Sequence, residues 1–308
     1  MLINRNFLIQ KAALIAEKIL REPRNFCLYN DLGLVLSDLN DIKGAENSFL
    51  LAIKFSNHYP VPFLNLASVL IKNNRFKEAD QYICKAIDIS GDYAEAYYLK
   101  GLINRKNMLY DKFEANLLQA LELNPQYFPA WFALAEYYSS INSIERSINC
   151  YKNILKEKST SKIIFNELGN LFKKIGCYSE SLDYYNLAIN IDKNFSIALN
   201  NRANLLFELG RVNDAIDDYK SAIFVSPNFA EAYNNLGSLY MDIKNYENAL
   251  FNINKAIAIK KDFSIAYYNL GRLHLILKDP DSASIYLNMA LKENPSLALN
   301  IEASGISI

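Results

Sequence analysis

A 34-residue period runs through the chain and constrains its fold more than any other feature. A column of glycine or alanine recurs at this step without a break at Gly33, Ala67, Gly101, Ala135, Gly169, Ala203, Gly237 and Gly271. A second column, 19 residues after the first, is alanine in every repeat except the fourth, where Ile154 stands. Such self-similarity predicts a stack of like units, because each unit can bury its apolar face only against its neighbours.

The large residues of each repeat keep helical spacing. Four residues before the first small residue stands a large side chain, and it is aromatic in every repeat except the sixth, where Leu199 takes the place. The second half of a repeat carries an i, i+4, i+7 stripe, as in Ala215, Tyr219 and Ala222. These spacings predict two amphipathic helices per repeat. Short polar or proline-bearing turns such as Ser226-Pro227 separate the repeats.

The period predicts an all-α fold with three parts. Residues 1–25 form a capping helix, and residues 298–308 form a short C-terminal stub. Between them, 26–297 hold eight 34-residue repeats that begin at residues 26, 60, 94, 128, 162, 196, 230 and 264. We expect 94–160 to be the irregular part of the stack, because Phe113 and Ile154 replace small residues there. The stub contains poor helix formers, so the last repeat is weakly capped and a homodimer through this end is possible.

This pattern resembles the tetratricopeptide repeat (TPR) over residues 26–297. Its marks are large–large–small spacing in the first helix, small–aromatic–small spacing in the second, and a proline at the end of several repeats such as Pro125 and Pro295. The resemblance implies a right-handed superhelical solenoid of helix-turn-helix hairpins. It also implies a concave groove lined mainly by the first helices, and a role as a protein-protein interaction scaffold or adaptor that binds peptide segments there.

Asparagine is concentrated at the fifth and sixth residues of the repeats, which are expected to face the groove. It fills 8 of these 16 places, whereas 37 asparagines in 308 residues would put about two there by chance. A carboxamide both donates and accepts, so a row of them suits the backbone of an extended peptide. The predicted solvent-facing binding residues are Asn65, Asn166, Asn170, Asn200, Asn201, Asn204, Asn234, Asn235, Asn269, Lys173 and Lys174. The alternative is that these asparagines are solvated or bond to the adjacent helix.

Repeats six to eight are closest in pattern to the TPR arm of O-GlcNAc transferase-like proteins, as in Asn228-Phe229-Ala230-Glu231-Ala232-Tyr233-Asn234-Asn235-Leu236-Gly237. That resemblance implies an asparagine ladder for protein substrates at Asn65, Asn201, Asn235 and Asn269, interrupted at the equivalent places of the other repeats. No catalytic domain accompanies these repeats in the chain. A second hypothesis is therefore a substrate-recognition arm that acts with a separate glycosyltransferase- or sulfotransferase-type enzyme.

Composition excludes several other functions. Lys+Arg 33 balance Asp+Glu 33, which argues against nucleic acid as a partner. No run of 18 apolar residues predicts a membrane span, and four cysteines without a CxxC pair favour a reducing, cytoplasmic setting. With two histidines and no nucleotide, hydrolase or metalloprotease motif, we expect no catalysis, cofactor or metal.

A local basic stretch is the remaining charged feature of the sequence. It contains Lys152, Lys156, Lys158, Lys162, Lys173 and Lys174. Charge runs on helices are usually solvated faces, and the functional alternative is a docking spot for an acidic segment of a partner.

Overall fold

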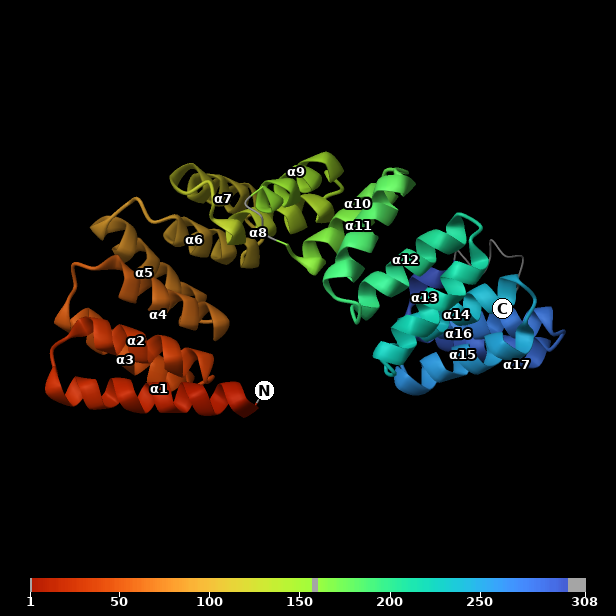
Figure 1. Ribbon diagram of the computed structural model, residues 1–308, viewed down its shortest axis with the longest axis horizontal. Coiled ribbons are helices and arrows are strands. Elements are labelled where there is room, and N and C mark those ends of the chain that lie inside the picture. Colours follow the sequence, from red (N-terminus) through yellow and green to blue (C-terminus); the bar gives the residue numbers. More distant parts are fainter. Residues whose placement is uncertain (1, 157–159, 299–308) are drawn as a thin grey trace. The chain divides into compact units, whose positions relative to one another are not determined.

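The computed structural model describes residues 2–156 and 160–298, and every regular element within them is helical. This part of the chain forms seventeen α-helices and one 3-10 helix and contains no strand, which confirms the predicted all-α fold (Figure 1). It divides into two compact bodies, residues 1–158 and 159–308, called here the N-terminal and C-terminal bodies. None of the helices described is both long and apolar enough to cross a bilayer.

The N-terminal body contains a single helix followed by four hairpins. Its helices are α1 (Leu2–Arg21), α2 (Phe26–Asp38), α3 (Ile42–Phe55), α4 (Pro60–Lys72), α5 (Phe76–Ile89), α6 (Ala94–Lys106), α7 (Tyr110–Leu123), α8 (Phe128–Ser140) and α9 (Ile144–Leu155). Helix α1 packs against α2 and buries Ile15. Each first helix of a hairpin packs on its own second helix, and α2, α4 and α6 also contact one another in sequence.

The C-terminal body contains four further hairpins with the same pairing. Its helices are α10 (Lys162–Lys174), α11 (Tyr178–Ile191), α12 (Ser196–Glu208), α13 (Val212–Val225), α14 (Ala230–Asp242), α15 (Tyr246–Ile259), α16 (Ser264–Ile276) and α17 (Pro280–Glu293), followed by the 3-10 turn η1 (Pro295–Leu297). Helices α10, α12, α14 and α16 contact one another in that order, so each body is a solenoid of stacked hairpins. The right-handed sense of the superhelix stays a prediction.

The small-residue column lies where the two helices of a hairpin touch. A Cβ added at Gly33 would lie 2.5 Å from the Phe49 ring, and one at Gly169 would lie 2.6 Å from the Tyr185 ring. Both aromatic side chains are fully buried. The period in the sequence therefore records one requirement, that the first helix leave room for a large side chain of the second.

The turn inside each hairpin has a feature that the sequence analysis missed. The fifteenth residue of every repeat adopts a positive φ, at Asn40, Asn74, Met108, Asn142, Gly176, Gly210, Lys244 and Lys278. Glycine and asparagine tolerate this left-handed conformation, which often ends a helix, whereas Met108, Lys244 and Lys278 adopt it against the steric preference of a Cβ. Methionine and lysine have no turn preference, and their presence at three of the eight turns hid the regularity.

The segment expected to be irregular and the C-terminal stub both include an end of one of the bodies. The segment 94–160 contains the division between the bodies, and α9 ends at Leu155. Phe113 and Ile154 are both buried, so these larger residues fill space in the N-terminal body. Of the C-terminal stub, residues 299–308 lie outside the described residues, and the homodimer through this end stays a prediction.

Replacing Lys278 by glycine should stabilise the chain. The side chain is exposed and its φ is 61°, so the change removes steric strain without removing packing. The free energy of unfolding should rise by up to about 1 kcal/mol, measured from urea unfolding monitored by circular dichroism. Gly210→Ala at the equivalent turn should have the opposite sign, and equal effects of the two changes would contradict this account of the turn.

Gly169→Ala should destabilise the chain by about 1–3 kcal/mol, because the Tyr185 ring cannot move away. Its hydroxyl donates a 2.7 Å hydrogen bond to Asn170, which fixes the ring against the glycine. Gly101→Ala is the control from the same column, since its nearest neighbour at 3.1 Å is the flexible end of Leu117. If thermal unfolding shows the same loss for both variants, the ring contact is not what demands glycine.

Candidate functional site

The predicted binding residues lie on five first helices, which belong to two bodies. Asn65 lies on α4 in the N-terminal body, and the other ten lie on α10, α12, α14 and α16 in the C-terminal body. Within the C-terminal body the sequence spacing therefore brings them together along one row of neighbouring helices. We call this set the asparagine row.

Part of the asparagine row is buried, contrary to the expectation that it faces solvent. The exposed fractions are 2% for Asn166, 5% for Asn200, 3% for Asn234 and 6% for Asn269. Asn201 and Asn235 are only partly buried, as is Asn65 in the N-terminal body. Asn166, Asn200 and Asn234 are fifth residues, which lie beneath the next hairpin rather than on the open face, and Asn269 is a sixth residue that bonds to the buried Asn234.

The buried amides are held by a repeated hydrogen bond between hairpins. In each case the sixth-residue Nδ2 donates to the fifth-residue Oδ1 of the preceding repeat, 35 residues earlier. The four pairs are Asn65 to Asn30 at 2.8 Å, Asn201 to Asn166 at 3.0 Å, Asn235 to Asn200 at 3.1 Å and Asn269 to Asn234 at 3.0 Å. The asparagine row is thus first of all a joint between hairpins, which is the alternative left open by the sequence.

One pair of positions shows that this joint can also be apolar. Leu64 and Leu99 occupy the same fifth and sixth places in the second and third repeats, and both are buried. An amide pair and a leucine pair are therefore two solutions to one packing problem, because either leaves no unpaired polar atom. This equivalence provides a way to separate stacking from any contact with a ligand.

The partly buried asparagines keep hydrogen-bonding capacity beyond the joint. Asn235 uses one N–H on Asn200, which leaves its Oδ1 and second N–H for another molecule. Asn201 is more occupied, because its amide group also donates to Asn170 at 3.3 Å. The Oδ1 atoms of Asn170 and Asn204 accept hydrogen bonds from the hydroxyls of Tyr185 and Tyr219.

The two predicted lysines differ in their surroundings. Lys173 makes a 2.7 Å ion pair with Glu208 of the next first helix, while Lys174 is exposed. The ion pair neutralises much of the charge that Lys173 could offer to an acidic partner. Lys174 therefore retains more of the predicted basic character of this face.

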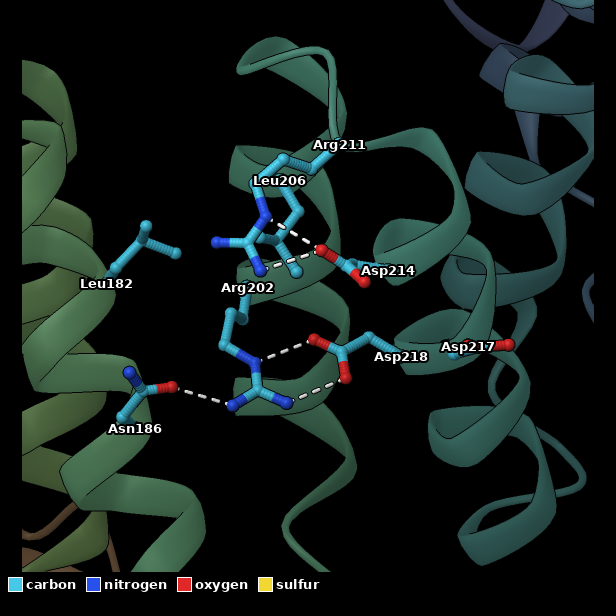
Figure 2. Close-up of a pocket in the computed structure, with 8 residues that line it drawn as sticks. All are labelled: Leu182, Asn186, Arg202, Leu206, Arg211, Asp214, Asp217 and Asp218. Carbon is cyan, nitrogen blue, oxygen red and sulfur yellow. Dashed lines mark hydrogen bonds and ion pairs between the residues drawn. The ribbon is translucent and has the colours of Figure 1, made fainter.

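A separate polar cavity of about 280 Å³ lies among α11, α12 and α13 (Figure 2). The Arg202 guanidinium lies at the centre of the lining residues. It donates hydrogen bonds to both carboxylate oxygens of Asp218 at 2.7 Å and to the Asn186 Oδ1 at 2.6 Å. Arg211 pairs with Asp214 at its edge. The sequence signal was an arginine in a column of leucines, but the sequence did not show its partners. Arg202 links α12 to both α11 and α13, whereas the Asp217 carboxylate, which also lines the cavity, belongs to neither ion pair.

No metal site is found in the part of the chain that the structure describes, since three His, Cys, Asp or Glu side chains nowhere gather closely enough to hold an ion. His274 contacts Asp279 at 3.1 Å and stacks on Tyr286. This arrangement joins the two helices of the last hairpin.

Family models match several segments of the chain. A model described as TPR repeat matches residues 203–244, and a model described as tetratricopeptide repeat matches 62–93, 94–127, 230–263 and 265–297. Together these matches cover just over half of the chain and fall in both bodies.

Two curated relatives match parts of the chain. Superkiller protein 3 of Schizosaccharomyces pombe is 30% identical over 143 residues, which are 42% of this chain and 10% of that protein. Human Protein O-mannosyl-transferase TMTC3 is 28% identical over 130 residues, which are 37% of this chain and 14% of that protein. The chain therefore spans a small part of the length of these relatives.

Two solved structures have the same fold. The structure of the APC/C hetero-tetramer Cut9-Hcn1 gives a TM-score of 0.61 at 15% identity and covers 88% of this chain and 54% of that chain. The structure of pilF from Pseudomonas aeruginosa gives 0.56 at 17% identity and covers 68% and 97%. At these identities the likeness concerns the fold alone.

The joint between hairpins can be tested with the Asn234–Asn269 pair. Asn234→Leu alone leaves the buried Asn269 amide without its acceptor, so unfolding by urea should show a loss of about 1–3 kcal/mol. The double variant Asn234→Leu/Asn269→Leu copies the Leu64–Leu99 pair and should recover most of this loss. Additive losses in the double variant would show that the amides are not coupled.

Proposed function

Because the chain belongs to the tetratricopeptide repeat family, we propose that it is a non-catalytic scaffold or adaptor that binds extended peptide segments of protein partners. Repeats of this family commonly mediate protein–protein interaction, and their stacked hairpins offer a long surface for it. In this proposal the peptide binds the face formed by the first helices of the C-terminal body. The observation that carries it is the spare hydrogen-bonding capacity of Asn235, together with the more limited capacity of Asn201.

The binding role is narrower than the sequence predicted. Asn166, Asn200 and Asn234 are buried acceptors of the joint. Their role in the proposal is to position the sixth-residue asparagines of the next repeats, and they do not contact the peptide. The sixth-residue amides are held at a fixed spacing by these bonds. A pre-ordered donor and acceptor reduce the entropy lost on binding, which favours capture of a flexible segment.

Apolar side chains beside the asparagine row support the same proposal. Ile163, Ile197 and Ile265 are the second residues of α10, α12 and α16, and each is 47–49% exposed. Ile197 and Ile265 stand one helical turn before Asn201 and Asn269, so they lie on the same helix face. An extended peptide could pair its backbone with the amides and place alternate side chains against these isoleucines.

A second candidate function is a substrate-recognition arm for a separate glycosyltransferase- or sulfotransferase-type enzyme. The observation that favours it is the partial match to a Protein O-mannosyl-transferase. The two candidates share the peptide surface and differ in what happens to the peptide. A co-purifying transferase that modifies captured peptides would favour the arm, and capture of peptides without modification would favour the scaffold.

The cellular setting is a further part of the proposal. We place the protein in the cytoplasm, which agrees with four cysteines that all lie as free thiols. Burial raises the pKa of the Cys150 thiol to about 12, so that cysteine is a packing residue and not a reactive one.

The proposed function is tested by a variant that keeps the joint but removes the amides. Asn200→Leu/Asn235→Leu should stack as the Leu64–Leu99 pair does, yet it should lose the free groups of Asn235. Peptides selected from a random unstructured library on the wild-type protein should bind this variant about five- to tenfold more weakly in fluorescence anisotropy. Peptides N-methylated at the contacted backbone amide should lose a similar factor.

The matched control is Asn30→Leu/Asn65→Leu, which makes the same exchange in the N-terminal body. It should leave the affinity of these peptides unchanged, and circular dichroism should show that both double variants are folded. If the Asn200/Asn235 variant binds the selected peptides as the wild type does, the asparagine row is a joint alone and the peptide surface lies elsewhere.

A further inference from the structure

A carboxylate, an aromatic ring and a lysine meet between hairpins in the C-terminal body. Glu231, the second residue of α14, lies 3.5 Å from the Lys260 ammonium. The same ammonium lies 4.9 Å from the centroid of Phe263, the residue just before α16. Lys162 is held in a related way, because it lies 4.9 Å from the Phe195 ring and pairs with Asp192. The chain thus uses an acid and an aromatic ring together to hold its own cations.

The N-terminal body repeats this arrangement without the cation. Glu95 is the second residue of α6, as Glu231 is of α14, and Tyr127 directly precedes α8, as Phe263 precedes α16. The residue in the place of Lys260 is Asn124. Both residues cap the preceding second helix with an extended backbone, at φ −141°, ψ 96° for Asn124 and φ −127°, ψ 98° for Lys260.

Asn124 does not replace the missing charge. Its Oδ1 accepts a local hydrogen bond from the Gln126 backbone N–H at 3.0 Å. The Glu95 carboxylate has no hydrogen bond or ion pair with any residue of the described ranges, although the side chain is partly buried. Burial raises the pKa of Glu95, which is the expected effect on a carboxylate that lacks a compensating cation.

Tyrosine rings line the same place. Tyr98 stands one turn after Glu95 on α6, and its ring meets the Tyr127 ring edge to face with centroids 5.5 Å apart. Burial and then the Glu95 charge raise the pKa of Tyr127, which agrees with a carboxylate close to the phenol. Tyr98 and Tyr127 are both partly buried, so each keeps some surface open to another molecule.

The nearby cation Arg105 already has partners of its own. Arg105 pairs with Glu136 at 3.4 Å, and its guanidinium lies 5.7 Å from the Phe113 ring. The Arg105–Glu136 pair is neutral, so the Glu95 site keeps a net negative charge. Three His, Cys, Asp or Glu side chains do not come together here among the residues described, which argues against a metal ion as the occupant.

We propose that Glu95, Tyr98 and Tyr127 form a binding site for an arginine side chain of a protein partner. A guanidinium can stack on a tyrosine ring while it donates to a carboxylate, and it loses less hydration than an ammonium does. The partner's guanidinium lies beside Glu95 as the Lys260 ammonium lies beside Glu231. This site stands in the N-terminal body and does not depend on the asparagine row.

The test uses the full chain and three capped peptides, N-acetyl-Gly-Ser-X-Ser-Gly-amide, in which X is arginine, lysine or citrulline. Citrulline keeps the shape of arginine without its charge. Saturation-transfer NMR titrations should give the strongest binding for arginine, weaker binding for lysine, and about three- to tenfold weaker binding for citrulline. Glu95→Gln should remove the preference for arginine over citrulline.

Two further variants make the result specific. Asn124→Lys supplies the chain's own cation in the place of Lys260, so it should block the arginine peptide without removing any residue of the site. Glu231→Gln is the matched control in the C-terminal body, and it should leave arginine binding unchanged.

The proposal is overturned if citrulline binds the wild type as well as arginine does, or if arginine binding survives both Glu95→Gln and Asn124→Lys. It is also overturned if Glu231→Gln removes the binding. Circular dichroism of each variant reports folding, and Asn124→Lys keeps the test decisive if Glu95→Gln does not fold. None of these outcomes bears on peptide capture through Asn201 and Asn235.

Discussion

The close approach of two helices within each hairpin is the constraint on which the rest of this structure depends. It requires a residue without a large side chain on the first helix opposite a large buried one on the second, as at Gly33 with Phe49 and Gly169 with Tyr185. A hairpin built this way still exposes an apolar flank, which only another hairpin can cover. The first helices are thereby held side by side, and every surface with functional interest follows from their spacing.

The asparagine pairs show how stacking and binding compete for the same atoms. A buried carboxamide must be paired, and the neighbour that pairs it is the next residue of the same face one repeat later. Each pair uses one donor and one acceptor, so the asparagines at these places offer fewer free groups than their number suggests. What remains is concentrated on partly buried residues such as Asn235, whose positions are fixed by the buried Asn200. One asparagine of a pair therefore fixes the position of the other, and that other one keeps the free donor and acceptor.

Periodicity made the fold predictable because helix type, helix pairing and the small-residue contacts all repeat at 34 residues. Spacing also identified the helix face that carries Asn200 and Asn235, but it could not distinguish a residue on the open face from one beneath the next hairpin. The difference arises because a fifth residue contacts the residue 35 positions later in the chain. Two leucines can make this contact as well as two amides can. The turn at Lys244 was equally hidden, because its left-handed backbone is imposed by the hairpin and not by the side chain.

Repetition also explains how a chain of like units can present unlike sites. Stacking uses the columns of small and large residues and the amide joint, so exposed residues outside these positions can vary at little cost to the fold. One such position is the C-terminal cap of the second helix. It is Lys260 in the seventh repeat and Asn124 in the third, and the two residues have similar backbone angles. Where the lysine is present, the acid and the ring are satisfied internally. Where it is absent, the same acid and ring are partly buried and have no cation from the chain itself, and we infer that this one residue decides whether the place holds the chain's own cation or a partner's.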